Sequence, residues 1–222
     1  MRHLHHHSAS SAEQTQATQG HVLHWARAYD PFLSLLTLGR RARLRRTTVE
    51  LAAIQPGKHV LEVGCGTGDV ALAASEPASR DGAVYGIDPS PEMIAVAREK
   101  AARARRAVEF QVGVVEALAF PDASMDVVLS SLMMHHLPEA LKRRGLAEIV
   151  RVLKPEGRLL IVDFKRPTTP MARRMTTLLW HGRLREGVQD LPRLLHEAGF
   201  KQVRVGDMPL GMLGFVLGQL TP

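Results

Sequence analysis

The stretch Val60-Leu61-Glu62-Val63-Gly64-Cys65-Gly66-Thr67-Gly68-Asp69 places a glycine-rich turn directly after a short apolar run. The run predicts a strand at 59–63, and the residues after the turn predict a helix at 69–74. Glycine at such a turn lets the backbone approach a ligand closely, or it lets the helix pack tightly on the strand. The stretch therefore predicts a strand-turn-helix unit of an α/β fold, with either a nucleotide-type site or close packing at its turn.

The spacing of the glycines narrows the class of ligand. Gly64, Gly66 and Gly68 lie two residues apart, whereas the dinucleotide fingerprint has an extra residue before its third glycine to wrap a pyrophosphate. No Lys-Ser or Lys-Thr pair follows the turn, which disfavours a P-loop. Glu62 suits the ammonium end of a methionine moiety, because a carboxylate attracts a cation. We therefore expect a ligand that is not held by phosphates.

A second acidic residue follows about twenty residues after the turn, at the position where such folds hold a ribose. Tyr85-Gly86-Ile87-Asp88 ends the next predicted strand with this acid. The Asp88 carboxylate is placed to accept hydrogen bonds from both ribose hydroxyls. The alternative is an interaction with the first turn of the next helix, which Pro89-Ser90-Pro91 also suits.

Strand and helix patterns alternate along the rest of the chain. The predicted strands are 59–63, 84–87, 108–112, 126–130, 158–163, 201–205 and 212–217, and the predicted helices after the turn are 69–74, 91–105, 138–153 and 188–198. Such alternation favours a parallel sheet with crossover helices. We expect an α/β, Rossmann-like domain at 55–222 with a seven-stranded, mostly parallel sheet and helices on both faces. A helical lid at 21–54 and a disordered tail at 1–20 would precede it.

Composition limits the class of protein. The chain has 222 residues, 45% of them hydrophobic and 23% charged, which is typical of one globular domain. It has no uninterrupted apolar run of about 18 residues and no apolar segment behind the N-terminal charges, so we expect a cytoplasmic protein without a membrane-spanning helix or secretory signal. A single cysteine, Cys65, excludes an internal disulfide and a cysteine-rich zinc site, and we expect no metal.

The chain is basic, with a formal net charge of +7 and a cluster of arginines at 40–46. Beside the apolar residues of 32–38, this cluster would suit a helix that touches an anionic membrane surface. The alternative is that the leucines pack on the sheet and the arginines face water. Peripheral membrane contact is thus an open prediction.

Four motifs occur in order: LEVGCGTG at 61–68, GIDPSPEM at 86–93, AFPDASMD at 119–126 and LKPEGRL at 153–159. Together they resemble the class I S-adenosylmethionine (SAM)-dependent methyltransferases, in the branch of the ubiquinone/menaquinone biosynthesis C-methyltransferases. The resemblance implies SAM as methyl donor, S-adenosylhomocysteine as product, and a small-molecule acceptor such as a quinone or phenol. The residues that it implies for cofactor binding are Glu62, Gly64, Cys65, Gly66, Asp88, Pro89, Met93, Val114, Val115 and Ser130.

One position departs from the family pattern. The family usually has an Asp after the glycine equivalent to Gly113, and this Asp accepts a hydrogen bond from the adenine amino group. Here the residue is Val114, and Glu116 follows two positions later. We expect weaker or less adenine-selective cofactor binding as a result.

The acceptor side offers three candidate catalytic residues. His135 and His136 follow the predicted strand 126–130, at the edge where ligands bind in such folds, and a histidine suits removal of a proton from a phenol or hydroquinone. The alternative for either is a capping or packing role. Tyr29 lies in a Tyr-Asp pair that resembles a family element closing over the active site. The alternative for Tyr29 is an aromatic anchor for the lid.

Two other functions are weighed against a small-molecule methyltransferase. Methylation of base amino groups commonly uses an Asp/Asn-Pro-Pro-aromatic element after the fourth strand, but this chain has Ser130-Ser131-Leu132-Met133, which disfavours a nucleic acid as partner. A non-catalytic SAM-binding partner is supported only by Val114, and Glu62 and Asp88 argue against it.

Overall fold

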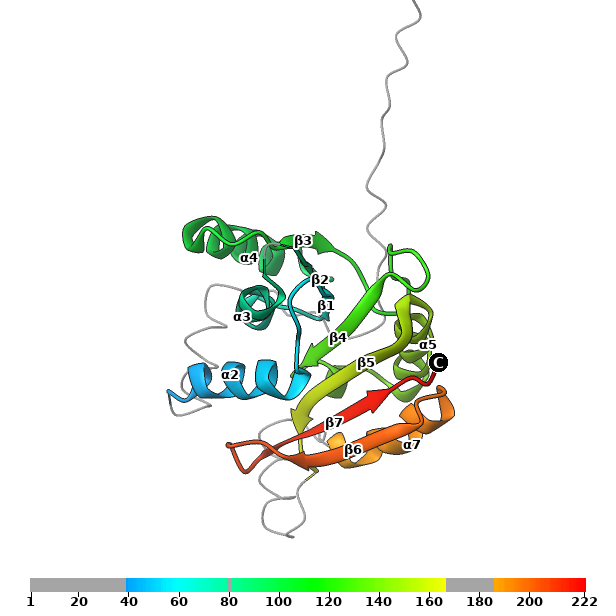
Figure 1. The fold of residues 1–222 in the computed structure, drawn as a ribbon. Coiled ribbons are helices and arrows are strands. Elements are labelled where there is room, and N and C mark those ends of the chain that lie inside the picture. The colour runs from blue at the N-terminus through cyan, green and yellow to red at the C-terminus, as the bar shows by residue number, and fades with distance from the viewer. Residues whose placement is uncertain (1–38, 80, 167–185) are drawn as a thin grey trace, which may run out of the picture.

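A computed structural model describes residues 39–79, 81–166 and 186–222 (Figure 1). The predicted tail at 1–20, Tyr29 and most of the predicted lid lie outside the described residues. Seven strands form one sheet in the order β3-β2-β1-β4-β5-β7-β6. The strands are β1 (His59–Val63), β2 (Ala83–Asp88), β3 (Glu109–Val112), β4 (Met125–Ser131), β5 (Leu153–Phe164), β6 (Gln202–Asp207) and β7 (Leu213–Gln219).

Helices cover both faces of this sheet, as the alternating pattern predicts (Figure 1). The α-helices are α2 (Arg41–Ala52), α3 (Asp69–Ala78), α4 (Pro91–Ala104), α5 (Glu139–Val152) and α7 (Leu191–Glu197), and the 3₁₀ helices are η1 (Met134–His136) and η2 (Val188–Asp190). Helices α2, α3 and α4 lie on one side of the sheet, and α5 and α7 lie on the other. The predicted Rossmann-like arrangement is confirmed.

The order of the strands fixes where a ligand can bind. Strands β1 to β5 are mutually parallel, and β7 runs antiparallel to both of its neighbours, β5 and β6. Among the described strands, β7 is therefore the one that runs against the others. From β1 the chain moves outward through β2 to β3, and then returns to the other side of β1 with β4 and β5. The order in which strands are added to the sheet therefore reverses between β1 and β4. In open α/β sheets, ligands bind at the carboxyl ends of the strands at such a point.

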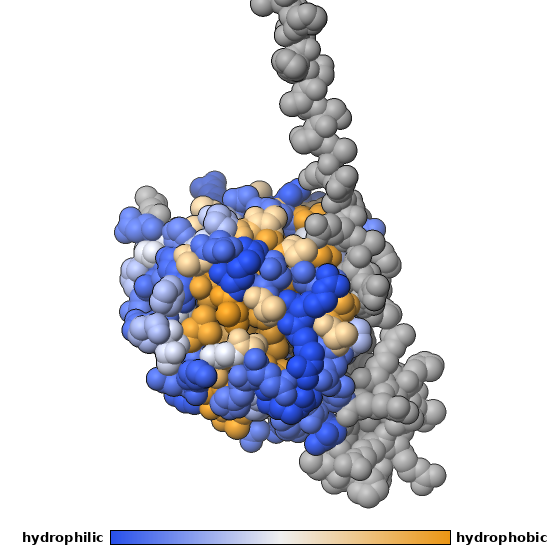
Figure 2. All heavy atoms as spheres, turned by 90° about the vertical axis from the view of Figure 1, so that its right-hand side faces the viewer, coloured by the Kyte–Doolittle hydropathy of each residue, from blue (hydrophilic) through white to orange (hydrophobic). Residues whose placement is uncertain are grey.

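Alternating side chains of the strands build two separate cores. In β1, Val60 packs with α2, α3 and α4, whereas Leu61 and Val63 pack with α5 and α7. In β5, Leu160 and Val162 face the first core, and Leu159 and Ile161 face the second. A strand with apolar residues on both faces is typical of a parallel sheet that is covered on both sides. On the side of the molecule that lies to the right in Figure 1, apolar residues gather between hydrophilic ones (Figure 2).

Most predicted bounds lie within two residues of the structure, and three elements differ further from their predictions. Helix α3 continues to Ala78 instead of ending at 74, and Pro77 lies in its last turn. Strand β5 begins at Leu153 instead of 158, because Leu153 pairs with Met125 and a register shift absorbs the following Pro and Gly. The helix predicted at 188–198 is the 3₁₀ turn η2 followed by α7.

Helix α2 is the described part of the predicted lid. Its Leu44 and Ala52 are buried in the first core, and its Arg41 and Arg45 form ion pairs with Asp69 at the start of α3. Two arginines of the basic cluster thus bind a carboxylate of the protein itself. The apolar residues of 32–38 lie outside the described residues, so membrane contact stays a prediction. Within the described ranges, no helix is both long and apolar enough to cross a membrane.

Candidate functional site

The glycine-rich turn joins β1 to α3 at the point where the sheet reverses. Gly64, Gly66 and Gly68 have φ values of +67°, +52° and +80°, a region of backbone conformation that favours glycine. Two hydrogen bonds tie the turn to β2: Cys65 N–H donates to the Ile87 carbonyl at 2.9 Å, and Gly66 N–H donates to Oδ2 of Asp88 at 2.9 Å. These two bonds fix the position of the turn relative to β2.

Close packing explains part of the glycine pattern. A Cβ on Gly64 would collide with the side chain of Met133, which follows β4, and a Cβ on Gly68 would collide with Phe110 and Ala97. Gly68 thus serves the packing of α3 against its neighbours. The contact between Gly64 and Met133 brings the segment after β4 directly against the turn.

Glu62 is a buried carboxylate behind the turn, with only 2% of its surface exposed. Its Oε2 accepts a hydrogen bond from Ala71 N–H of α3 at 2.7 Å. Burial raises the pKa of Glu62 well above its usual range, and the nearby Asp69 and Asp88 raise it further, although the Ala71 bond opposes this. A cation bound next to Glu62 would relieve this cost, which fits a site for an ammonium group.

Asp88 ends β2 and organises the start of α4. Its Oδ1 accepts from Ser90 N–H at 2.9 Å, and the Ser90 hydroxyl in turn caps α4 by accepting from Met93 N–H at 3.3 Å. Burial raises the pKa of Asp88, against the hydrogen bonds from Ser90 and Gly66. The structure thus shows the interaction with the following turn, and each carboxylate oxygen keeps a lone pair for a further donor. Pro89 and the buried Met93 flank this carboxylate along the chain.

Ser130 carries an unsatisfied polar atom at the same edge. It lies in β4, pairs with Val63 of β1 and Ile161 of β5, and is 1% exposed. Its hydroxyl has no hydrogen-bond partner among the described residues. A buried hydroxyl without a hydrogen-bond partner lowers the stability of the folded protein, and most buried polar groups have a partner. The Ser130 hydroxyl therefore fits a ligand that supplies the missing bond.

Val114 and Val115 form an apolar wall beyond Asp88. Both are buried, with 5% and 6% of their surface exposed, and Gly113 N–H donates to the Asp88 carbonyl at 3.1 Å. Position 114 itself therefore presents an apolar side chain where the resemblance implies an Asp. The residues predicted to bind the cofactor thus lie along one edge, formed by the ends of β1, β2, β3 and β4.

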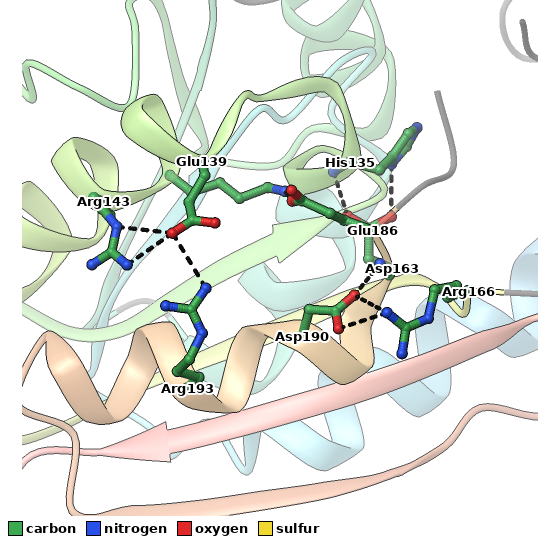
Figure 3. Close-up of polar contacts among 10 residues, drawn as sticks. His135, Glu139, Arg143, Asp163, Arg166, Glu186, Asp190 and Arg193 are labelled. Atoms are coloured by element: carbon green, nitrogen blue, oxygen red, sulfur yellow. Dashed lines mark hydrogen bonds and ion pairs between the residues drawn. The ribbon is translucent and has the colours of Figure 1, made fainter. Parts of the chain in front are cut away.

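His135 lies at this edge in η1 and binds Asp163 near the end of β5 (Figure 3). Oδ1 of Asp163 is 2.7 Å from Nδ1 of His135, and Oδ2 accepts from the His135 backbone N–H at 3.0 Å. The His135 ring lies 3.9 Å from the His136 ring between centroids and meets Phe164 edge-on at 5.0 Å. His135 and His136 therefore lie together, with His135 held on three sides.

Sequence reasoning assigned no role to Asp163. The predicted strand 158–163 ends on this residue, and an acid at a strand end on the ligand-binding edge is the signal that could have identified it. A second unforeseen pair joins the buried Lys142 of α5 to Glu186, near the His135–Asp163 pair (Figure 3). Among the described residues, no group of three or more His, Cys, Asp or Glu side chains could hold a metal ion.

Comparison with known proteins identifies the family of the chain. The model of a methyltransferase domain family matches residues 60–157. The chain is 34% identical to a ubiquinone/menaquinone biosynthesis C-methyltransferase from Citrifermentans bemidjiense over 73% of this chain and 68% of that protein. It is also 34% identical to a demethylmenaquinone methyltransferase from Shouchella clausii, over 66% of this chain and 62% of that protein.

The fold is shared with solved structures. A SAM-dependent methyltransferase from Aquifex aeolicus superposes with a TM-score of 0.71 at 24% identity, over 86% of this chain and 98% of that chain. This superposition shows the fold, whereas the relative at 34% identity shows the family. The chain belongs to the class I SAM-dependent methyltransferases and is related to the ubiquinone/menaquinone biosynthesis C-methyltransferases.

Proposed function

We propose that the protein transfers a methyl group from SAM to a small acceptor that carries an ionisable hydroxyl on a ring, such as a quinol or a phenol. Two relatives named for menaquinone biosynthesis support this class of acceptor. The observation that supports the proposal is the packing of Met133, two residues before His135, against Gly64 of the turn that would hold the methyl donor. A proton acceptor and a cofactor site thus share one edge of the sheet.

The described residues fit the cofactor. Glu62 would hold the ammonium group and Asp88 the ribose hydroxyls. Ser130, whose hydroxyl has no partner in the part of the chain that the structure describes, would bind a further polar atom. Gly64, Cys65 and Gly66 would lie under the methionine part, and Pro89, Met93, Val114 and Val115 would line the nucleoside. When bound, SAM supplies a methyl group on a sulfonium, and the enzyme mainly has to position donor and acceptor for an in-line displacement.

Calorimetric titration with SAM and S-adenosylhomocysteine tests the cofactor site. We expect the wild-type protein to bind both, and Asp88→Ala to lose most of this affinity because the ribose hydroxyls lose their acceptor. Glu99→Ala is the control, since Glu99 is an exposed acid of α4. Absence of binding by the folded wild-type protein would contradict the cofactor site, and equal loss in Glu99→Ala would contradict the role of Asp88.

Transfer of a labelled methyl group tests the acceptor class. The donor is SAM with a radioactive methyl group, and the probes are reduced 1,4-naphthoquinone, catechol, phenol and bulk RNA. We expect label in the reduced naphthoquinone or the phenols. Label in RNA alone would overturn the proposed acceptor class in favour of a nucleic-acid methyltransferase.

A further inference from the structure

We propose that Asp163 is a positioning residue that holds His135 in the tautomer with a free Nε2, and that this nitrogen removes the proton from the acceptor hydroxyl. The inference rests on the proposed function, because it concerns the acceptor half of the same reaction. It assigns a role to a side chain that is 28 residues away from His135 in sequence.

The tautomer follows from the hydrogen bonds of Asp163. Both of its oxygens accept backbone N–H groups: Oδ2 accepts from His135 at 3.0 Å, and Oδ1 accepts from Phe164 at 2.7 Å. These obligatory donors favour a carboxylate that only accepts. Oδ1 also lies 2.7 Å from Nδ1 of His135, so Nδ1 must carry the proton of that bond. The neutral ring then has its lone pair on Nε2.

The orientation of the ring is fixed as well as its tautomer. The side chain of Asp163 is 3% exposed, so its position is set by the interior, whereas that of His135 is 14% exposed and remains within reach of a ligand. The rings of His136 and Phe164 restrict rotation of His135 from two sides. In proteins, a buried acceptor that binds Nδ1–H commonly orients a histidine so that Nε2 can accept a proton or bind a ligand.

The location of the pair fits proton removal next to the methyl donor. Leu132 N–H donates to the Val162 carbonyl at 2.8 Å, which fastens the segment after β4 to the end of β5. Met133 of that segment contacts Gly64 of the cofactor turn. Asp163 therefore lies at the end of β5, on one side of β4, and His135 lies in the segment that follows β4. The turn after β1 lies on the other side of β4.

The proton balance is simple. Breaking the acceptor O–H bond leaves the electron pair on the acceptor and moves the proton to Nε2, which makes an imidazolium that the Asp163 carboxylate stabilises. The deprotonated oxygen, or the ring carbon that it activates, forms a bond to the methyl carbon as the electron pair of the carbon–sulfur bond passes to sulfur. If the ring carbon is methylated, its C–H bond then breaks and that proton moves to the oxygen, which restores the ring. One proton thus leaves the acceptor for each methyl group gained, and His135 releases it to water afterwards.

The tautomer can be measured without any acceptor. Long-range ¹H–¹⁵N spectra of the full chain with ¹⁵N-labelled histidine report which ring nitrogen carries the proton, and His135→Gln identifies the signals of His135. We expect a protonated Nδ1 in the wild-type protein. We expect Asp163→Ala to abolish this preference, because the side-chain acceptor of the Nδ1 proton is then gone. A protonated Nε2 in the neutral wild-type ring would overturn the proposal, whether or not the variant folds.

Kinetics with the best acceptor of the labelled-methyl assay test the chemical role. We expect His135→Gln and Asp163→Asn each to lower kcat by about 100-fold or more, the range of general-base catalysis, with KM for the acceptor changed by less than about threefold. In His135→Gln the rise of kcat with pH should disappear. His196→Gln, an exposed histidine of α7, should leave kcat unchanged.

Calorimetry separates the two possible failures. Unchanged SAM affinity in both variants, together with a kcat equal to that of the wild type, would overturn the role of Asp163 and His135 and leave the methyltransferase function standing. Loss of SAM binding in the wild-type protein would instead contradict the cofactor site. A structural role alone would change the thermal stability of Asp163→Asn without changing the pH profile.

Discussion

The backbone N–H of Gly66 donates a hydrogen bond to Oδ2 of Asp88 at 2.9 Å, so the carboxylate at the end of β2 holds the turn that follows β1. The same carboxylate is the proposed ribose acceptor. Its other oxygen accepts from Ser90 N–H, and Ser90 caps α4. One buried side chain therefore fixes a loop and a helix start before any ligand binds, which lowers the cost of ordering the site on binding.

Glu62→Gln should stabilise the protein without ligand and weaken its binding of SAM. Burial raises the pKa of Glu62 above its unfolded value, so the folded state binds the proton more tightly, and stability falls as pH rises from the unfolded pKa of about 4.3 through the folded pKa. Glutamine keeps an oxygen for Ala71 N–H and removes the buried charge. The affinity for SAM should fall by about tenfold or more, as expected for loss of a charged hydrogen bond.

Thermal unfolding at pH 5 and pH 8 measures this effect. The gain in Tm of Glu62→Gln over the wild type should be larger at pH 8, and Glu99→Gln should show no such gain. A variant that is less stable than the wild type at pH 8 would show that the charge of Glu62 is compensated inside the protein.

Gly64→Ala should destabilise the protein more than Gly57→Ala. Both glycines have positive φ, +67° and +80°, so both substitutions carry a backbone cost of about 1 kcal/mol. Only the new Cβ at position 64 meets another side chain, that of Met133, and overpacking adds about 1–3 kcal/mol. Urea unfolding of Gly64→Ala, Met133→Ala and the double variant measures the coupling. If the double variant shows simple additivity, Met133 is not the cause.

Val114→Asp should tighten binding of S-adenosylhomocysteine and increase selectivity for adenine. The substitution restores the acceptor that the family places at this position, in a wall that is now apolar. Calorimetry should compare S-adenosylhomocysteine with its inosine counterpart, which lacks the adenine amino group. The wild-type protein should bind both with similar affinity. Val112→Asp, at an exposed valine, is the control. Unchanged affinity in folded Val114→Asp would count against an adenine contact there.

Asp126→Asn should lower stability at neutral pH but not in acid. Burial raises the pKa of Asp126, but hydrogen bonds from Lys154, His59 N–H and Lys58 outweigh it and bring the pKa to about 2. A lowered folded pKa gives stability above the unfolded pKa of about 3.9, and this stability is lost as pH falls through the folded value. Because both lysines are partly exposed, the loss at pH 7 should be only about 1 kcal/mol.

Urea unfolding at pH 7, 4 and 3 follows this loss. The difference between Asp126→Asn and the wild type should shrink from pH 4 to pH 3. Asp122→Asn is the control, since Asp122 is 78% exposed and pairs only with Arg151 among the ion pairs described. An equal difference at pH 7 and pH 3 would mean that shape and not charge decides the effect.

The carboxyl ends of β1 and β2 were predictable from sequence because local patterns define them. Each pattern spans only a few residues of sequence: a run of apolar residues, three glycines at fixed spacing, and an acid at the end of the next strand. The bounds of β5 were not predictable in this way. The pairing of Leu153 with Met125 carries the strand through a proline and a glycine, and that pairing exists only in the assembled sheet.

The sequence by itself determined the α/β class, the seven strands, and the placing of Glu62, the glycines and Asp88 at one strand-turn-helix unit, because periodicity and chain order are local properties. Only the tertiary structure decided that Asp163 binds His135, that the Ser130 hydroxyl lacks a partner among the described residues, and that Arg41 and Arg45 bind Asp69. The physical reason is that hydrogen bonds and ion pairs between distant residues depend on which strand ends meet at the edge of the sheet. No spacing along the chain encodes that meeting.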